Sequence, residues 1–302
     1  MPELPDVAVY VERLGELLGG QPLERARLKS AFLLRSFDPP LSELEGKRVT
    51  ATSRLGKRII IEFEEQLLLV LHLMIAGRLH WRPRGVALSR KSDLLALDFP
   101  TGSLLLTEAG TKKRASLHVV RGSDALSEFD RGGIEPFACT REEFAQAMRR
   151  ENRTLKRALT DPRLVSGVGN AYSDEILHRA GLSPLKRTHA LDDGELARLH
   201  EATRSVLGEW LVRLRAEAQG GFPEKVTAFR PEMAVHGKYR KPCPVCGTPV
   251  QRIVYAANEA NYCPKCQTGG RLLADRALSR LLGEDWPRSL EELEELKLRA
   301  KR

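Results

Sequence analysis

Four of the five cysteines in this 302-residue chain lie in one short stretch near its C-terminal end. They form two Cys-x-x-Cys pairs separated by sixteen residues, which is the spacing of a four-thiolate zinc site. Each pair forms a tight turn that directs two sulfurs at one ion. Four thiolates leave no coordination position open, so the spacing predicts one structural Zn²⁺ held by Cys243, Cys246, Cys263 and Cys266. Four free thiols are the alternative. The remaining cysteine, Cys139, is predicted to be a buried structural thiol.

The chain carries a surplus of positive charge, with a formal net charge of +9. Such a surplus suits a polyanionic partner, because each Lys or Arg that meets a phosphate releases a counterion. A merely solvated basic surface explains it equally well. No apolar run reaches the roughly 20 residues that a membrane span needs, and Glu3 and Asp6 stand where a secretory signal would be basic. We therefore expect a cytoplasmic, nucleoid-associated monomer that contacts no membrane.

The hydrophobic pattern changes its period along the chain. Residues 5–18 have helical spacing and are followed by two glycines. From about residue 23 to 120, short apolar runs alternate with turns, which is typical of the strands of a sandwich or barrel. After a glycine-containing linker the pattern becomes helical again, and Thr140 with Glu143 forms a predicted capping box. Helices are expected over residues 140–149, 153–160, 171–180, 195–218 and 272–282.

These patterns predict an α+β protein with an N-terminal helix and a β-sandwich, followed by a helical domain. The predicted parts are an N-terminal domain over residues 1–122, a linker over 123–139, a helical domain over 140–232, a zinc finger over 233–267 and a C-terminal helical extension over 268–302.

A glycine-rich segment, Ser166-Gly167-Val168-Gly169-Asn170, comes just before one predicted helix. Glycines at a helix start let the backbone approach a ligand closely, and the N–H groups there bind anions. We expect Asn170 to cap the helix and to donate to a phosphate. A helix-turn-helix connection that needs glycine for its turn is an equally good interpretation.

The third candidate site is the start of the chain, Met1-Pro2-Glu3. A small residue at position 2 favours removal of Met1, which leaves Pro2 with a free secondary amine. α-Amino groups titrate near neutrality, so a neutral fraction can attack an electrophilic carbon and form an iminium. Glu3 can then act as general acid and base. From this segment alone, a helix-start proline followed by a first-turn acid is the simpler interpretation.

Taken together, these segments resemble the formamidopyrimidine-DNA glycosylase and endonuclease VIII family. The segments that resemble its N-terminal domain are Pro2-Glu3-Leu4-Pro5-Asp6, Leu55-Gly56-Lys57-Arg58 and His72-Leu73 through Gly77. Those that resemble its helix–two-turn–helix motif are Gly167-Val168-Gly169-Asn170-Ala171-Tyr172 and Asp174-Glu175. His236-Gly237 before the cysteines resembles its zinc finger. The matches occur in order as far as about Gln267.

The resemblance implies a helix packed on a β-sandwich, a helical domain with the helix–two-turn–helix motif, and a zinc-finger β-hairpin. It also implies that damaged DNA, double-stranded or partly single-stranded, lies in the cleft between the domains. The implied activity is that of a base-excision glycosylase and abasic-site lyase acting on damaged, oxidised bases, with the nucleotide turned out of the duplex.

In that mechanism Pro2 attacks C1′ of the deoxyribose, Glu3 protonates the sugar, and elimination cuts the strand. Lys57 holds a phosphate or assists charge development beside Pro2. By the same resemblance, Lys156, Gly169 and Asn170 match positions that grip the DNA backbone near the lesion.

The chain departs from the family pattern in places that concern lesion reading. Asn258 stands where relatives carry an arginine that clamps phosphates, and an amide cannot make a charged fork. Residues 108–114 replace the Asp-Pro-Arg-Arg-Phe-Gly stretch that supplies intercalating side chains. Met74 or Ile75 can still serve as an apolar wedge. The chain also continues for 35 residues after Gln267. The preferred base therefore stays open.

Three other functions compete with this one. A non-catalytic protein of the same fold that binds damaged DNA or abasic sites explains the departures, but it leaves Pro2 and Glu3 without a role. A zinc-ribbon DNA-binding or transcription protein explains only the charge and the cysteines. An N-terminal-proline tautomerase has no use for the zinc site or the basic helical domain.

Overall fold

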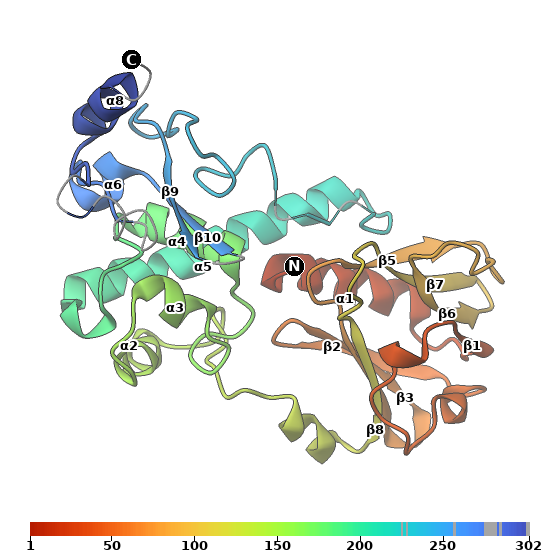
Figure 1. The fold of residues 1–302 in the computed structure, drawn as a ribbon. Coiled ribbons are helices and arrows are strands. Elements are labelled where there is room, and N and C mark those ends of the chain that lie inside the picture. Colours follow the sequence, from red (N-terminus) through yellow and green to blue (C-terminus); the bar gives the residue numbers. More distant parts are fainter. Residues whose placement is uncertain (225, 228, 256–257, 275–282, 284–285, 300–302) are drawn as a thin grey trace. The chain divides into compact units, whose positions relative to one another are not determined.

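The structure is a computed structural model that describes residues 1–302 apart from 225, 228, 256–257, 275–282, 284–285 and 300–302. The chain divides into two compact units (Figure 1). The first comprises Met1–Gly132 and Gly208–Ala228, and the second comprises Gly133–Leu207 and Phe229–Arg302.

The first unit contains helix α1 (Leu4–Leu18) and two four-stranded antiparallel sheets. One sheet has the order β1-β6-β7-β5, with β1 at Arg25–Leu28, β6 at Asp93–Phe99, β7 at Gly102–Glu108 and β5 at Gly77–Arg82. The other has the order β2-β3-β4-β8, with β2 at Val49–Leu55, β3 at Arg58–Phe63, β4 at Leu67–His72 and β8 at Ser116–Arg121. One hydrophobic core joins α1 to both sheets.

Helix α1 forms where its apolar residues recur at helical spacing. Val7, Tyr10 and Leu14 are all fully buried in the main core. The Asp6 carboxylate accepts the Glu3 backbone N–H at 3.0 Å, which satisfies a donor at the start of the helix. This confirms the predicted first helix.

Strand β3 is buried on both of its faces. Ile59 and Ile61 lie in the main core, whereas Ile60 points to the opposite face and packs with Val70 and Phe129. Because successive side chains of a strand alternate in direction, the run of three isoleucines needs a cover on each side. Phe129 follows a short 3₁₀ helix, η4 (Ser123–Glu128), so the start of the predicted linker covers this sheet.

The second unit is mainly helical. Its helices are α2 (Arg141–Arg149), α3 (Leu155–Thr160), α4 (Asn170–Ala180), the first part of α5 (Asp193–Ala218), α6 (Pro264–Thr268) and α8 (Leu290–Arg299). Strands β9 (Gln251–Tyr255) and β10 (Asn258–Tyr262) form an antiparallel hairpin. Thr140 and Glu143 cap α2 reciprocally, as predicted, with side-chain bonds of 3.1 and 2.8 Å to each other's backbone N–H.

The α+β class is therefore confirmed, with some differences in detail. Helix α3 begins at Leu155 rather than residue 153. Residues 275–282, most of the last helix expected before the tail, lie outside the described residues, and residues 272–274 are not helical. In the part of the chain that the structure describes, no helix is both long and apolar enough to cross a membrane.

Candidate active site and zinc centre

The start of the chain and Lys57 form a cluster of charged groups in the first unit. Glu3 is 2% exposed and Pro2 is buried. Lys57 lies in the two-residue turn between β2 and β3, where Gly56 has φ +60°. Burial lowers the pKa of Lys57, and the nearby Glu3 carboxylate opposes that shift. The structure thus brings together the three residues proposed for catalysis.

The terminal amine is also perturbed. Its pKa is lowered mainly because the amine is buried, while Arg78 and Lys57 add to the shift. The carboxylates of Glu3 and Asp6 act in the opposite direction. Met1 carries this amine in the structure, and removal of Met1 would place the amine on Pro2. A lower pKa gives a larger neutral fraction at neutral pH, and the neutral form is the nucleophile.

A neutral histidine lies beside this cluster. His72 is paired with Arg58 across β3 and β4. Burial, with smaller contributions from the charges of Arg58 and Lys57, lowers the pKa of His72 to about 4. At neutral pH its imidazole is uncharged, so it can donate a hydrogen bond to a phosphate without adding charge. In the sequence His72 stands out only as part of a longer motif, because its burial depends on residues far away in the chain.

The turn between β4 and β5 carries both wedge candidates. The Gly77 N–H donates to Leu73 O at 2.9 Å, and Met74 has φ +51°, a left-handed conformation that is uncommon outside glycine. Ile75 is 57% exposed, whereas Met74 is half-buried. Of the two, Ile75 is the side chain that the turn presents to solvent.

The glycine-rich segment of the second unit differs from the expectation in one respect. Gly169, not Asn170, is the N-cap of α4, and Asn170 is the first helical residue. A cap residue needs an extended backbone, and Gly169 has φ −133° and ψ −155°. The prediction that Asn170 caps the helix is therefore wrong. The side chain of Asn170 is half-exposed and does not cap α4.

Lys156 belongs to a buried polar network centred on Asp174. Its Nζ donates to Asp174 Oδ1 at 2.6 Å and to Asn170 O at 2.6 Å. Asp174 is fully buried, and its Oδ2 lies 2.8 Å from His236 Nδ1 and accepts from Asn261 Nδ2 at 3.2 Å. An ammonium can make three hydrogen bonds, and the described residues accept two from Lys156, which is 8% exposed.

The neighbouring Glu175 accepts backbone N–H groups of Ala234, Val235 and His236 at 2.7 to 2.9 Å. Burial raises its pKa, and these three bonds oppose the shift. The sequence analysis missed the structural roles of Asp174, His236 and Asn261. The available signal was a pair of acids, Asp174-Glu175, in the middle of an otherwise buried helix.

The four predicted zinc ligands come together. Their sulfur atoms all lie within 4.8 Å of one another, with Cys246 Sγ 3.4 Å from Cys263 Sγ and Cys243 Sγ 3.9 Å from Cys266 Sγ. Zn–S bonds of 2.3 Å in a tetrahedron place the sulfurs about 3.8 Å apart, so the four thiolates fit one structural zinc. The hairpin of β9 and β10 leads into the second pair. Asn258 begins β10, but its side chain is outside the described part of the chain.

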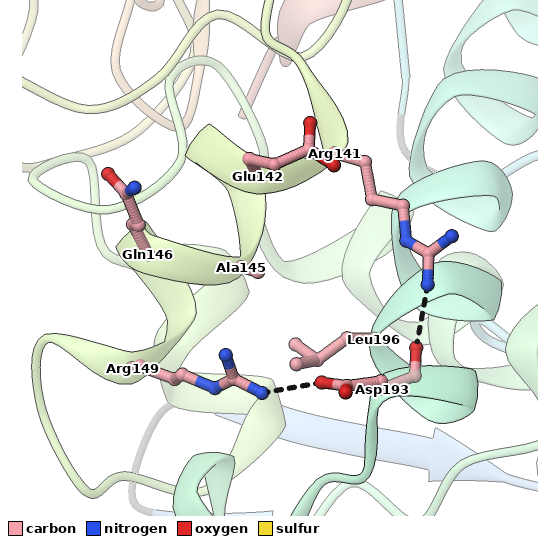
Figure 2. Close-up of a pocket in the computed structure, with 7 residues that line it drawn as sticks. All are labelled: Arg141, Glu142, Ala145, Gln146, Arg149, Asp193 and Leu196. Atoms are coloured by element: carbon pink, nitrogen blue, oxygen red, sulfur yellow. Dashed lines mark hydrogen bonds and ion pairs between the residues drawn. The ribbon is translucent and has the colours of Figure 1, made fainter.

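A shallow hollow elsewhere in the second unit is lined by α2 and the start of α5 (Figure 2). Two arginines that line the hollow donate to Asp193. Arg149 donates to Asp193 Oδ1 at 2.7 Å, and Arg141 donates to the backbone O of Asp193 at 3.3 Å. The predicted site residues are not among those that line it. The hollow is therefore not a candidate site.

The chain resembles known proteins along most of its length. Residues 1–116 match the formamidopyrimidine-DNA glycosylase N-terminal domain, residues 133–217 match the formamidopyrimidine-DNA glycosylase H2TH domain, and residues 240–269 match a zinc finger found in FPG and IleRS. The formamidopyrimidine-DNA glycosylase of Thermus thermophilus is 32% identical over 282 residues, which cover 89% of this chain and all of that protein. That of Listeria innocua is 28% identical over 279 residues, covering 88% and 100% of the two chains.

Solved structures agree with the sequence comparison. The Lactococcus lactis enzyme in complex with DNA that contains an abasic site matches with a TM-score of 0.79 and 26% identity, covering 88% of this chain and 99% of that one. The same enzyme with DNA that contains a formamidopyrimidine also has a TM-score of 0.79, with coverage of 88% and 100%. The chain belongs to the formamidopyrimidine-DNA glycosylase family of base-excision repair.

Proposed function

We propose that this DNA glycosylase excises damaged bases, and cleaves the strand at the resulting abasic site, through an iminium formed by Pro2. The observation that carries the proposal is the charged cluster at the chain start. A terminal amine with a lowered pKa lies close to the buried Glu3 carboxylate and to Lys57. An amine with a lowered pKa beside a carboxyl group is the arrangement that amine nucleophiles use.

The bond changes follow from these groups. The lone pair of the neutral Pro2 nitrogen bonds to C1′, and the electrons of the glycosidic bond leave with the base. The Glu3 carboxylate takes the N–H proton of the resulting ammonium and delivers it to O4′ as the C1′–O4′ bond opens, and the nitrogen lone pair then forms the iminium. The positive nitrogen acidifies the C2′ proton, and its loss expels the 3′-phosphate. The positive charge of Lys57 adds to the lowering of the pKa of the Met1 amine, and we assign it the same effect on Pro2 once Met1 is removed.

DNA with a damaged or abasic nucleotide is the substrate class that the solved relatives suggest. We assign Lys57, the remaining donor of Lys156, the half-exposed Asn170 and the Gly169 backbone to the phosphate backbone. Ile75 is the wedge, with Met74 shaping its turn. Asn258 contributes a hydrogen bond in place of the arginine of relatives. The zinc holds the hairpin that carries Asn258 in shape and takes no part in the bond changes.

Borohydride trapping on a duplex with an abasic site tests the mechanism. The protein processed at Met1 should form a covalent adduct, and peptide mass spectrometry should place the linkage on the Pro2 nitrogen. Glu3→Gln should lower the rate of trapped-adduct formation by about 10²- to 10⁴-fold, the usual effect of losing a general acid–base group. Glu16→Gln, an exposed acid on the same helix, is the matched control and should behave as wild type.

The same experiment tests one alternative function, binding of abasic DNA without catalysis. The replacement of an arginine by Asn258 favours a protein that binds abasic DNA without turnover. That protein would shift the duplex in a binding assay but give no adduct. Equally, an undiminished adduct from the combined Pro2→Gly and Glu3→Gln variant would exclude the roles assigned to these two residues.

A further inference from the structure

Three residues on one face of strand β5 hold a segment that follows α5. Arg78, His80 and Arg82 alternate along the strand, so their side chains lie on the same face. The segment comprises Phe222, Pro223, Glu224 and Val226, belongs to the same unit as β5, and is called the strap below. β5 is the edge strand of its sheet, and these three side chains contact the strap.

The contacts between β5 and the strap are directional. Arg78 Nε donates to Val226 O at 2.6 Å. His80 Nδ1 lies 2.8 Å from Glu224 Oε2, and Arg82 binds both Glu224 oxygens at 2.7 and 2.9 Å. The strap also reaches α1, because the Phe222 and Tyr10 rings are 5.6 Å apart. Val226 itself is buried in the main core. The strap is therefore a fixed part of the first unit.

Arg78 alone among these three also contacts the β4–β5 turn in the bonds that the structure describes. Its Nη1 donates to Gly77 O at 2.6 Å and to Ile75 O at 3.2 Å. The turn is tight: a Cβ added at Gly77 would lie 2.3 Å from Leu73 O. Met74 is left-handed in the same turn, and the bonds of Arg78 link the backbone that carries Ile75 to Val226 of the strap.

Arg78 is also close to the chain start. Its positive charge acts on the terminal amine, together with Lys57, and against the carboxylates of Glu3 and Asp6. One guanidinium thus connects the exposed Ile75 turn, the strap and the position of the nucleophile. A guanidinium suits this task because its donors point in several fixed directions, whereas a lysine ammonium is a point charge on a flexible stem.

We propose that Arg78 is a positioning residue that holds the Ile75 turn in register with the amine at the chain start, so that insertion of Ile75 into the DNA stack places the turned-out sugar at Pro2. The proposal rests on the function proposed above and names a residue that this function did not yet include. Loss of the guanidinium of Arg78 should therefore slow the reaction on duplex DNA, where Ile75 must enter the base stack, and should not slow it on single-stranded DNA.

Arg78→Lys is the primary test, because it keeps the charge and removes the fork. The measured quantity is the single-turnover rate of borohydride-trapped adduct at saturating enzyme, on an abasic duplex and on the same abasic strand alone. The duplex rate should fall about tenfold, in line with the loss of a charged hydrogen bond. The single-strand rate should change less than about twofold, since no stack must be entered. Arg82→Lys is the matched control, because Arg82 lies on the same face and bonds Glu224 and Trp81 O but not the β4–β5 turn in the described structure; it should keep the wild-type ratio of the two rates.

Two further variants separate positioning from charge and from loss of fold. Ile75→Ala should reproduce the loss of rate on duplex DNA. Adding Arg78→Lys to Ile75→Ala should lower the rate no further, because both substitutions impair the same insertion step. Arg78→Met also removes the charge. The acid limb of the pH–rate profile should then move to higher pH, since the amine loses a neighbour that disfavours its protonation, while Arg78→Lys should leave that limb in place.

The outcomes are distinct. Equal losses on duplex and single strand, or an Arg82→Lys variant as impaired as Arg78→Lys, would overturn the positioning role. A 2-aminopurine placed beside the abasic site reports insertion through its fluorescence without any chemistry. If wild-type protein forms no adduct, the proposed function fails, and the fluorescence of wild type against Arg78→Lys still decides this proposal. A response unchanged by Arg78→Lys would refute it.

Discussion

Single residues at the chain start owe their chemistry to their surroundings. Lys57 and the terminal amine are both shifted toward their neutral forms, chiefly by burial, and each feels the buried Glu3 carboxylate. His72 is shifted in the same direction and lies next to two cations. The site therefore holds several nitrogen groups whose protonated forms are disfavoured, which suits a neutral amine nucleophile.

His72 should make the first unit sensitive to acid. Its folded-state pKa of about 4 lies below the ordinary value of 6.5, so the unfolded chain binds a proton in this interval and the folded chain does not. Stability should fall as the pH drops from about 7 toward 4. His72→Asn should weaken this dependence, measured as the urea midpoint at pH 7 and pH 5. His189→Asn, at an exposed position, should keep the wild-type dependence. An identical pH dependence in wild type and His72→Asn would contradict the assignment.

At the scale of elements, helix α4 organises the second unit. It contacts β10 and α3 (Figure 1). Asp174 joins Lys156 on α3 to Asn261 on β10, while Glu175 holds the backbone just before the zinc ligands. His178 of the same helix lies 3.2 Å from Cys243 Sγ. One helix thus connects the glycine-rich turn to the zinc centre.

Asp174→Asn should destabilise the second unit by about 3–5 kcal/mol, because it leaves the buried Lys156 ammonium without its counter-charge. Urea unfolding followed by far-UV circular dichroism measures the change. Adding Lys156→Met should recover part of the loss, since the unpaired charge is then removed as well. Asp124→Asn, at an exposed position, controls for the substitution itself. A loss below about 1 kcal/mol for Asp174→Asn would show that the network is not needed for folding.

At the scale of the whole molecule, the chain is built from two units with separate cores. The main core of the first unit draws on α1 and both sheets, whereas the thiolates of the second unit pack with Val235 and Val250 in a small cluster of their own. So small a cluster contributes little apolar burial, and metal binding must supply much of the local stability.

Removal of zinc should therefore act on one unit only. Chelation, or Cys243→Ser, should abolish hydrogen-exchange protection in β9 and β10 and weaken DNA binding. Protection in β6 and β7 of the first unit should stay unchanged. Hydrogen exchange followed by mass spectrometry resolves both regions in one sample. Simultaneous loss of protection in both units would argue against two separately stabilised parts.

Much of this protein could be predicted from local sequence features. The cysteine spacing predicted the metal centre, Thr140 with Glu143 predicted the start of α2, and helical spacing predicted α1. Each of these signals spans only a few residues or turns, and each is set by geometry that neighbours in the chain determine alone. Pro2 and Glu3 were different, because that segment alone favours an ordinary helix start, and the family resemblance supplied their candidate roles.

The tertiary structure decided what depends on residues far apart in the chain. The four members of the Asp174 network, Lys156, Asp174, His236 and Asn261, are brought together only by folding, and so are Arg78 and the strap. Burial, which shifts the pKa of His72 and of the terminal amine, is likewise a property of the packed unit. A sequence specifies which groups are available, but their protonation and partners follow from the low-dielectric surroundings that long-range packing creates.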